Sequence, residues 1–440
     1  MNLNLTAAMK YFLPQRRAGC QRQSRSVLLA SVAFLICLLA MPALAAPKPH
    51  VIPGIKPFES GGRRVINLIA KDGYISAPDG NSLYVWGYGV SNKMQYPGPT
   101  LILGQGNKVT INLTNFLTVP TSIIFPGQSN VLASNGVPGL ITREAPPNGG
   151  FVSYSFTAND PGTYMYNSGT RMDIQIEMGL VGALIVQPTV KTQAYAHANT
   201  AFLHEFLFLL TEMDPRVHDL VDLGMIDMVD TTTFFPVYWF INGRCSPDTM
   251  ADDNVIWLPH QPYSCLPRMR PGEKLLLRLI GGGRDSHPFH HHGANSITIA
   301  RDGRMLESAP GAGPDLADSD FTVTVIPGGT ADAIFTWTGD KLGWDMYGHK
   351  ASDPLMPFEY APDHGKPLPV QLPGIQDVFP GENWPGSPFL GKTGFLPPSQ
   401  VNYNPGGSFL HMWHSHNEKE IVNNDIFPGG MMTMLFIDSW

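Results

Sequence analysis

The chain has 440 residues, of which 15% are charged, and its 36 acidic and 29 basic residues give a formal net charge of −7. This balance supplies no basic face and argues against a nucleic-acid partner. The 45 Gly and 40 Pro are typical of a β protein rich in turns.

The first 45 residues are interpreted as an export signal, not as part of the fold. Basic residues between Lys10 and Arg25 precede an apolar run from about Val27 to Met41, and Ala43-Leu44-Ala45 provides a small-residue cleavage site. Retention of the run as an anchor is the alternative, although a bilayer span needs ~20 apolar residues. We expect a periplasmic or extracellular protein with no membrane span after signal removal.

Residues 60–190 are predicted to form a β-sandwich of short strands separated by turns. In the stretch 106–115, Val109, Ile111 and Leu113 alternate with polar neighbours, which indicates a half-buried strand. The other expected strands are 65–70, 81–89, 97–103, 151–156, 162–166 and 180–186. Strands at this spacing favour a sandwich.

Residues 200–440 repeat this plan and are predicted to form a second sandwich. A connector at 214–230 should contain a short helix. A stretch rich in Pro and Gly at about 341–408 interrupts the domain, and a loop of this length is usually functional or a lid. The expected strands are 201–210, 271–280, 295–300, 321–326, 410–413 and 431–437.

Four cysteines occur, and two of them, Cys20 and Cys37, would leave with the signal. Cys245 and Cys265 remain, 20 residues apart in a chain expected to be exported, which predicts a disulfide between them. A role as copper ligands is the weaker alternative, because neither lies in a motif with metal-ligand spacing.

Two histidine-rich motifs carry a family resemblance. The chain reads His287-Pro288-Phe289-His290-His291-His292-Gly293, and later His414-Ser415-His416 followed by Gly430-Met431. The pair resembles the last two copper-binding signatures of the multicopper oxidases, H-P-x-H-x-H-G and H-C-H with G-M. Segments 97–100 and 240–243 resemble the openings of cupredoxin domains. The resemblance implies an all-β fold of two cupredoxin-like Greek-key sandwiches, as in two-domain laccases, with copper as cofactor.

Carried over residue by residue, the resemblance makes His287 a blue-copper ligand and Met431 its weak axial ligand. It makes His290, His292, His414 and His416 ligands of the trinuclear copper cluster. Ser415 replaces the Cys, and a blue copper needs that thiolate with two imidazoles. The first-domain histidines of the family are replaced by Ile124, Pro126, Asn167 and Gly169. The standard blue-copper and trinuclear mechanism is therefore not expected.

The surviving histidines still favour a metal site. Because residues i and i+2 share a face of a strand, His290 pairs with His292, and His414 pairs with His416. Four converging imidazoles suit one copper or zinc ion. Further candidates are His411, whose i−3 offset from His414 argues against it, and a carboxylate of Glu418, Glu420 or Asp425, for which a solvated loop is the alternative. His349 and His364 could cap the site or lie on the loop surface.

These observations leave three hypotheses. The first is a copper oxidoreductase or electron-transfer protein with a remodelled site, the second a non-catalytic copper-binding or tolerance protein, and the third a metal-free structural module. The sequence leaves open whether the protein is an enzyme, and it does not identify the small molecule, metal ion or redox protein that would be its partner. A homotrimer rests only on analogy with two-domain laccases.

Overall fold

The computed structural model describes residues 49–347, 349–367 and 409–438. The predicted export signal and residues 368–408 of the predicted insertion lie outside these ranges. The described residues belong to one compact unit. Among the described residues, no helix is both long and apolar enough to cross a bilayer.

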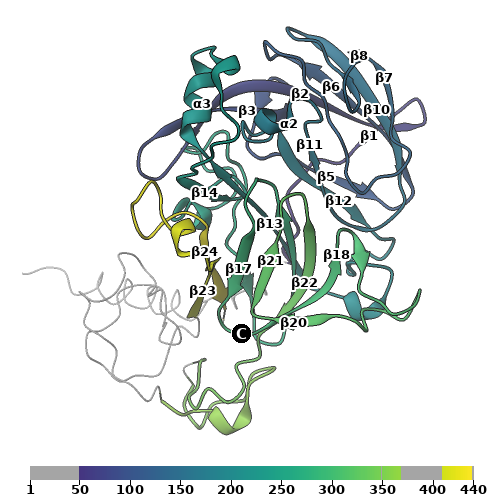
Figure 1. The fold of residues 1–440 in the computed structure, drawn as a ribbon. Coiled ribbons are helices and arrows are strands. Elements are labelled where there is room, and N and C mark those ends of the chain that lie inside the picture. Colours follow the sequence, from purple (N-terminus) through teal and green to yellow (C-terminus); the bar gives the residue numbers. More distant parts are fainter. Residues whose placement is uncertain (1–48, 348, 368–408, 439–440) are drawn as a thin grey trace, which may run out of the picture. The chain divides into compact units, whose positions relative to one another are not determined.

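The first sandwich is built from two sheets between residues 58 and 187 (Figure 1). Its larger sheet has the order β4-β3-β2-β6-β10-β7, with β1 on β2, and its smaller sheet has the order β11-β12-β5. Their bounds are β1 (Phe58–Ser60), β2 (Arg63–Ser76), β3 (Ser82–Val90), β4 (Lys93–Met94), β5 (Gly98–Gly104), β6 (Asn107–Asn115), β7 (Leu132–Asn135), β10 (Gly150–Ala158), β11 (Gly162–Asn167) and β12 (Val181–Gln187). A separate ribbon joins β8 (Val137–Pro138) to β9 (Arg143–Glu144).

Strand alternation builds the core of the first sandwich as predicted. On β6, Val109, Ile111 and Leu113 are buried while the intervening side chains are less so. They pack in one cluster with residues of the smaller sheet such as Leu184 and Val186. Burial of each such aliphatic side chain contributes roughly 1.5–3 kcal/mol, so the alternation fixes which face of β6 turns inward.

The second sandwich also has two sheets, and one of them carries the histidine motifs. One sheet has the order β14-β13-β16-β22-β18-β19 with β20 on β18, and the other has the order β15-β24-β23-β17-β21. Their bounds are β13 (His204–Met213), β14 (Tyr238–Ile241), β15 (Arg268–Met269), β16 (Lys274–Gly281), β17 (His287–His291), β18 (Ser296–Arg301), β19 (Arg304–Met305), β20 (Asp318–Asp320), β21 (Thr322–Val325), β22 (Thr330–Thr336), β23 (Phe409–Ser415) and β24 (Met432–Ile437). The all-β fold expected from the sequence is confirmed.

Helices in the part of the chain that the structure describes are few and short. The helix expected in the connector is α3 (Pro215–Asp222), which begins where the Asp214 side chain accepts a hydrogen bond from the Arg216 amide. The others described are α2 (Met172–Gln175) and the 3₁₀ turns η1 (Ala198–Thr200), η2 (Ile226–Met228), η3 (Asp248–Met250), η4 (Ala361–Asp363) and η6 (Glu418–Glu420). Every strand range expected from the sequence overlaps a strand of the structure.

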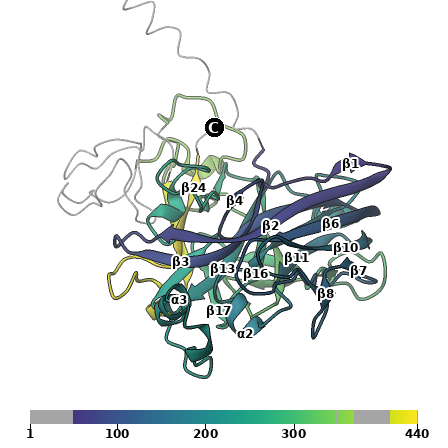
Figure 2. The same ribbon diagram turned by 90° about the horizontal axis from the view of Figure 1, so that it is seen from above.

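Apolar and charged contacts join the two sandwiches. Side chains of β13, including Leu207 and Leu209, share a cluster with Ile185 of β12. The buried Arg278 of β16 lies 3.0 Å from a carboxylate oxygen of Glu205 and donates to the Thr163 hydroxyl of β11 at 3.0 Å. Figure 2 shows β2, β6 and β10 of the first sandwich running beside one another, and β13 and β16 in the second.

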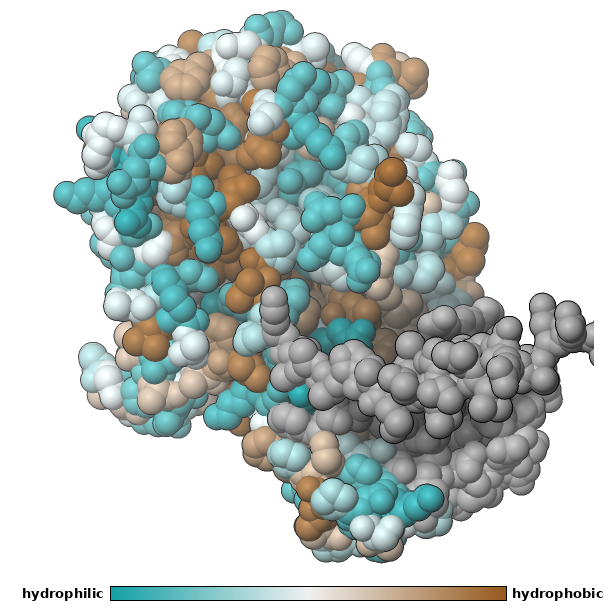
Figure 3. Space-filling model, turned by 180° about the vertical axis from the view of Figure 1, so that it is seen from behind, coloured by the Kyte–Doolittle hydropathy of each residue, from teal (hydrophilic) through white to brown (hydrophobic). Residues whose placement is uncertain are grey.

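The surface carries single hydrophobic residues among polar ones. Leu140 and Ile256 are 96% and 90% exposed. On the face shown in Figure 3, brown hydrophobic residues are interspersed with teal hydrophilic ones. Isolated exposed apolar side chains of this kind do not define a docking site.

The predicted disulfide between Cys245 and Cys265 is wrong. Both cysteines are free and buried. Cys245 packs in the cluster between the two sandwiches, whereas Cys265 packs in the core of the second sandwich. The Cys265 thiol donates to the Ile241 carbonyl at 3.1 Å. The side chains therefore enter different cores, which the spacing of 20 residues could not reveal.

Candidate metal centre

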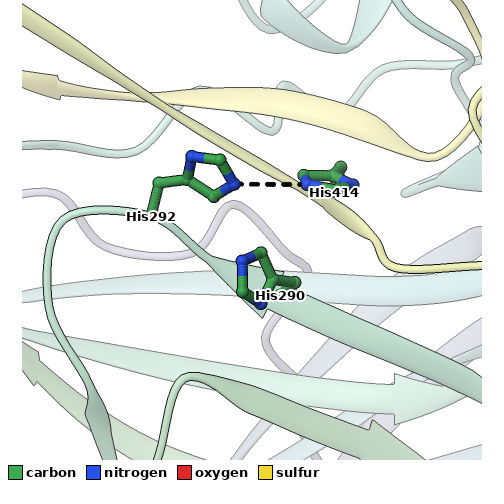
Figure 4. A group of neighbouring side chains, drawn as sticks. All are labelled: His290, His292 and His414. Carbon is green, nitrogen blue, oxygen red and sulfur yellow. Dashed lines mark hydrogen bonds between the residues drawn. The ribbon is translucent and has the colours of Figure 1, made fainter. Parts of the chain in front are cut away.

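Two adjacent antiparallel strands bring the histidine motifs together. β17 pairs with β23 so that His290 lies directly opposite His414. His292 follows β17 two residues after His290, and its backbone amide donates to the Met412 carbonyl of β23 at 3.3 Å. Figure 4 shows the rings of His290, His292 and His414 gathered between the two segments. The predicted convergence of the two motifs is therefore present.

The three rings present their nitrogens to a common point. One ligand nitrogen from each of His290, His292 and His414 lies within 4.8 Å of the other two. The Nε2 atoms of His292 and His414 are 3.4 Å apart. Two imidazole nitrogens that bind one metal ion at about 2.0–2.1 Å stand roughly 3.3 Å apart in tetrahedral geometry. We refer to these residues as the three-His cluster.

Neighbouring groups fix the orientation of two rings. The Nδ1 atom of His414 lies 2.7 Å from the Ser415 carbonyl. A carbonyl only accepts hydrogen bonds, so Nδ1 carries the proton and the neutral ring keeps a lone pair on Nε2, which faces His292. The Nδ1 atom of His290 lies 2.8 Å from the Thr322 hydroxyl on β21. Such outer contacts select the tautomer and aim the ligand atom in metal sites.

His416 borders the three-His cluster on its open side. Its ring centroid lies 4.8 Å from that of His290 and 5.5 Å from that of His414. Its side chain is 53% exposed and its Nδ1 lies 3.6 Å from a carboxylate oxygen of Glu418. His416 therefore lies beside the three-His cluster, where its exposed side chain has room to move, and it is not a member of the cluster.

Electrostatics keep the cluster neutral at pH 7. Burial, followed by repulsion from His292, His414 and His416, lowers the pKa of His290 to about 4. Burial is also the main cause that lowers the pKa of His292 and of His414. A metal binds the deprotonated imidazole, so these shifts favour the ligand form of each ring.

The structure places His287 outside this cluster, between two buried carboxylates. Its Nε2 lies 2.9 Å from Glu212 and its Nδ1 lies 2.9 Å from Glu420, and all three side chains are fully buried. Burial opposes the positive charge, but hydrogen bonds to Glu212 and Glu420 outweigh it and raise the pKa of His287 to about 9. Both ring nitrogens of His287 thus donate hydrogen bonds to carboxylates, which leaves neither nitrogen free to bind a metal.

The other positions of a blue-copper centre are also tied to this ion triad. The Ser415 hydroxyl accepts from the Asn417 amide at 3.2 Å, and the Asn417 side chain donates to Glu420 at 2.8 Å. Met431 is buried in the second core, and its amide donates to the Glu420 carbonyl at 2.7 Å. The solvated-loop alternative is wrong for Glu420. A hydrogen-bonded ion triad stands where the family resemblance implies a blue copper.

Two further histidines of the motifs belong to the core. His291 packs its ring 4.9 Å from that of Trp413, and burial lowers its pKa to about 3. His411 lies 5.9 Å from the ring of Trp337, and burial lowers its pKa to about 4. His411 is not part of the three-His cluster, which agrees with its predicted position on the other face.

Three of the four first-sandwich positions that resemble lost ligands, Ile124, Asn167 and Gly169, lie together. Ile124 and Asn167 form an antiparallel bridge, and a Cβ on Gly169 would stand 2.6 Å from the Ile124 side chain. Pro126 lies on the exposed surface. The Gly169 amide donates to the Ser122 hydroxyl at 3.1 Å. Neutral polar and apolar groups fill this place, so it offers no imidazole to a metal.

Sequence reasoning missed two residues that shape the site. Thr322 orients His290 from the neighbouring strand, and Glu212 reaches His287 from β13 in the facing sheet. A Thr or Glu in a predicted strand carries no distinguishing signal. For Glu420 a signal existed, because it stands four residues after His416, where the family resemblance expects a histidine.

Comparisons with known proteins identify multicopper oxidases and copper resistance proteins as proteins that this chain resembles. A family model described as multicopper oxidase matches residues 72–191. A multicopper oxidase of Cercospora beticola is 39% identical over 93 residues, which cover 21% of this chain and 14% of that protein. Copper resistance protein A of Pseudomonas syringae pv. tomato is 25% identical over 280 residues, covering 56% of this chain and 44% of that protein. The chain thus spans less than half the length of these relatives.

A solved structure has the same fold. The blue copper oxidase from Nitrosomonas europaea superimposes with a TM-score of 0.53 at 21% sequence identity, covering 85% of each chain. A second structure, the multicopper oxidase mgLAC, superimposes with a TM-score of 0.53 at 18% identity, covering 85% of this chain and 86% of that one. At these identities the likeness concerns the fold alone.

Proposed function

We propose, from the premise that the chain is a multicopper-oxidase-like cupredoxin protein, that it binds one copper ion at the three-His cluster and uses it in one-electron oxidoreductase chemistry. The observation that carries the proposal is the convergence of His290, His292 and His414 within 4.8 Å. Imidazole nitrogen is a preferred donor for copper, and the cluster holds its rings in the neutral form.

The residues present fit a mononuclear copper and not the full set of copper centres. His290, His292 and His414 would hold the ion, and the exposed His416 could supply a further nitrogen. Copper at such a site supplies reversible exchange of a single electron. The chain's own groups orient the ligands, since the Ser415 carbonyl holds the Nδ1 proton of His414 and Thr322 fixes His290. The open side at His416 would admit a substrate or redox partner.

The proposed chemistry bypasses the standard mechanism. Ser415 offers no thiolate, and His287 is engaged by Glu212 and Glu420. The first sandwich supplies no imidazole at the positions of Ile124, Asn167 and Gly169. These positions would therefore hold neither a blue copper nor a complete trinuclear cluster, and His290, His292 and His414 are the residues that would hold the ion.

A second candidate is non-catalytic copper binding in copper tolerance. It is favoured by the relatives named copper resistance protein A, one of which matches 56% of this chain. Storage or delivery would need the same three ligands and the same open side, but no turnover. The two functions therefore share a site and differ in activity.

The test is the metal content of the purified wild type beside the double variant His290→Ala/His414→Ala. His260→Ala, outside the cluster, is the matched control. We expect copper in the wild type and control and little in the double variant. Oxidation of phenols or metal ions that is lost in His414→Ala would support the oxidoreductase, whereas bound copper without turnover would support storage. A wild type without copper would overturn both.

We also propose that residues 1–45 direct export to the periplasm or cell exterior and are then removed. The basic and apolar order of the segment and its Ala-Leu-Ala site support this. N-terminal sequencing of the protein from its native compartment tests it, and a mature chain that begins at Met1 would contradict it. A homotrimer remains a proposal by analogy, tested by the mass of the protein in solution.

A further inference from the structure

A second group of potential ligands lies in the described part of the insertion, separate from the three-His cluster. One ligand atom from each of Asp345, His349, Glu359 and His364 lies within 4.8 Å of the other three. The set holds two imidazoles and two carboxylates. Sequence analysis considered His349 and His364 only as a cap or as loop surface, and it did not connect them with the two acids.

The distances within this group suit a single small cation. The Nδ1 atom of His349 lies 3.5 Å from Asp345 and 3.4 Å from Glu359. The Nδ1 atom of His364 lies 3.9 Å from Asp345 and 2.7 Å from Glu359. Ligands bound to zinc at about 2.0–2.1 Å in tetrahedral geometry stand roughly 3.3 Å apart. Shifts of well under 1 Å would therefore bring the four atoms onto one ion.

The outer contacts of the group match those of a metal site. The Nε2 atom of His364 lies 2.9 Å from the Asp353 carbonyl, so Nε2 carries a proton and a neutral ring aims the Nδ1 lone pair at Glu359. Histidine ligands nearly always donate their second N–H in this way. A lone pair and a carboxylate at 2.7 Å need a positive charge between them. Either a metal ion or a proton on His364 supplies that charge.

Backbone amides hold both carboxylates in place. Asp345 accepts from the amides of Tyr347 and Gly365, each at 2.8 Å, and Glu359 accepts from the Met356 amide at 2.8 Å. Oε1 of Glu359 faces the histidines, and so does Oδ2 of Asp345, which also accepts from the Gly365 amide. The side chains of Asp345 and Glu359 are 0% and 4% exposed, so both charges are buried and need compensation.

The group is anchored to the second sandwich at one end. Trp344, Met346 and Tyr347, which flank Asp345, are buried in its hydrophobic core. In the described part of the insertion, from 341 to 347 and 349 to 367, the regular structure is the 3₁₀ turn η4. An ion bound to this group would therefore tie a segment with little regular structure to the core through Asp345.

We propose that Asp345, His349, Glu359 and His364 form a structural zinc site that orders the segment from Asp345 to His364. Two carboxylates balance the charge of a divalent cation, and four protein ligands with no open position are typical of structural zinc. The histidine side chains are 18% and 12% exposed, which leaves a path for the ion to enter. This site is independent of the copper site proposed above and has a different ligand chemistry.

The test uses the full chain, stripped with a chelator and equilibrated with zinc chloride. Zinc bound per chain and its dissociation constant are measured for the wild type, His364→Ala and Glu359→Gln, with His197→Ala as the matched control. We expect both site variants to bind zinc more than about 100-fold more weakly, since even outer contacts change metal affinity by 10–100-fold. The variant His290→Ala/His414→Ala removes zinc that the three-His cluster could bind, and it should retain the zinc held by Asp345, His349, Glu359 and His364.

Hydrogen exchange of the wild type gives a second readout that needs no variant. We expect zinc to slow exchange at the amides of Tyr347, Met356 and Gly365. Equal protection with and without zinc would assign the positive charge to a protonated His364 and overturn the proposal. Unchanged zinc affinity in a folded Glu359→Gln variant would overturn it as well. Neither result would affect the copper site, so the two proposals fail separately.

Discussion

Replacement of both carboxylates around His287 by amides, as Glu212→Gln with Glu420→Gln, should change how stability depends on pH. In the folded protein the pKa of His287 is raised from 6.5 to about 9, after hydrogen bonds to the two acids outweigh burial. A raised pKa stabilises the fold fully below the unfolded value of 6.5. That contribution is lost as the pH rises through 9.

The magnitude follows from the size of the shift. Each pKa unit corresponds to about 1.4 kcal/mol, so a rise from 6.5 to about 9 contributes roughly 3 kcal/mol at low pH. In the double amide variant, burial alone acts on His287 and keeps its ring neutral. We therefore expect the variant to be less stable than the wild type by roughly 3 kcal/mol near pH 6.5. The difference should shrink towards pH 9, and it should grow below pH 6.5, because the unfolded variant then gains a proton on His287 that its folded state does not bind.

The assay is urea unfolding of both proteins across this pH range, with a chelator present so that metal binding does not contribute. The free energy of unfolding comes from linear extrapolation. Glu418→Gln is the matched control, because its side chain is 81% exposed and lies two residues from Glu420. Its pH profile should follow the wild type within about 0.5 kcal/mol. Parallel profiles for the wild type and the double variant would refute the reasoning.

Three more predictions follow from the sites. Copper should remain bound as the pH falls below 6.5 and should be released near pH 4, because burial is the main cause that lowers the pKa of His290 to about 4. The copper content after dialysis at stepped pH tests this, and release centred on pH 6.5 would contradict it. Ser415→Cys should give no intense blue absorption with copper, because His287 stays bound to Glu212 and Glu420; an intense blue band would show that the triad yields to the metal. Iodoacetamide without reductant should alkylate Cys245 and Cys265 in denaturant but not in the native protein, because burial raises the pKa of both thiols. If the mass in denaturant lacks both adducts, the two cysteines form a disulfide after all.

Local periodicity accounts for the part of the fold that the sequence predicts well. The alternation of Val109, Ile111 and Leu113 predicts a strand at 106–115, and the structure has β6 at 107–115. Pairing between distant strands leaves no such local pattern. The contact between β17 and β23 was expected only because both motifs resemble copper-binding signatures.

In the candidate site, too, the sequence predicts what depends on local spacing and misses what depends on distant parts of the chain. The i, i+2 spacing placed His290 with His292 and His414 with His416, and the structure gathers His290, His292 and His414 across the paired strands β17 and β23. His287 shares the motif, but its partners Glu212 and Glu420 come from other parts of the chain, so the motif alone could not show that it is an ion-paired residue. The sequence did not predict the group around Asp345 and Glu359 for the same reason, because neither acid lies in a motif with metal-ligand spacing.

The position of β23 between β17 and β24 has a consequence for the order in which the chain is built. The Trp413 indole donates to the His292 carbonyl at 3.0 Å across a separation of 121 residues. During synthesis, this edge of β17 stays uncovered until residues 409–415 of β23 have been made. A chain truncated within the insertion would keep His290 and His292 but leave β17 as a bare sheet edge, prone to aggregation. Copper loading at the proposed site would thus distinguish chains that contain β23 from chains that lack it.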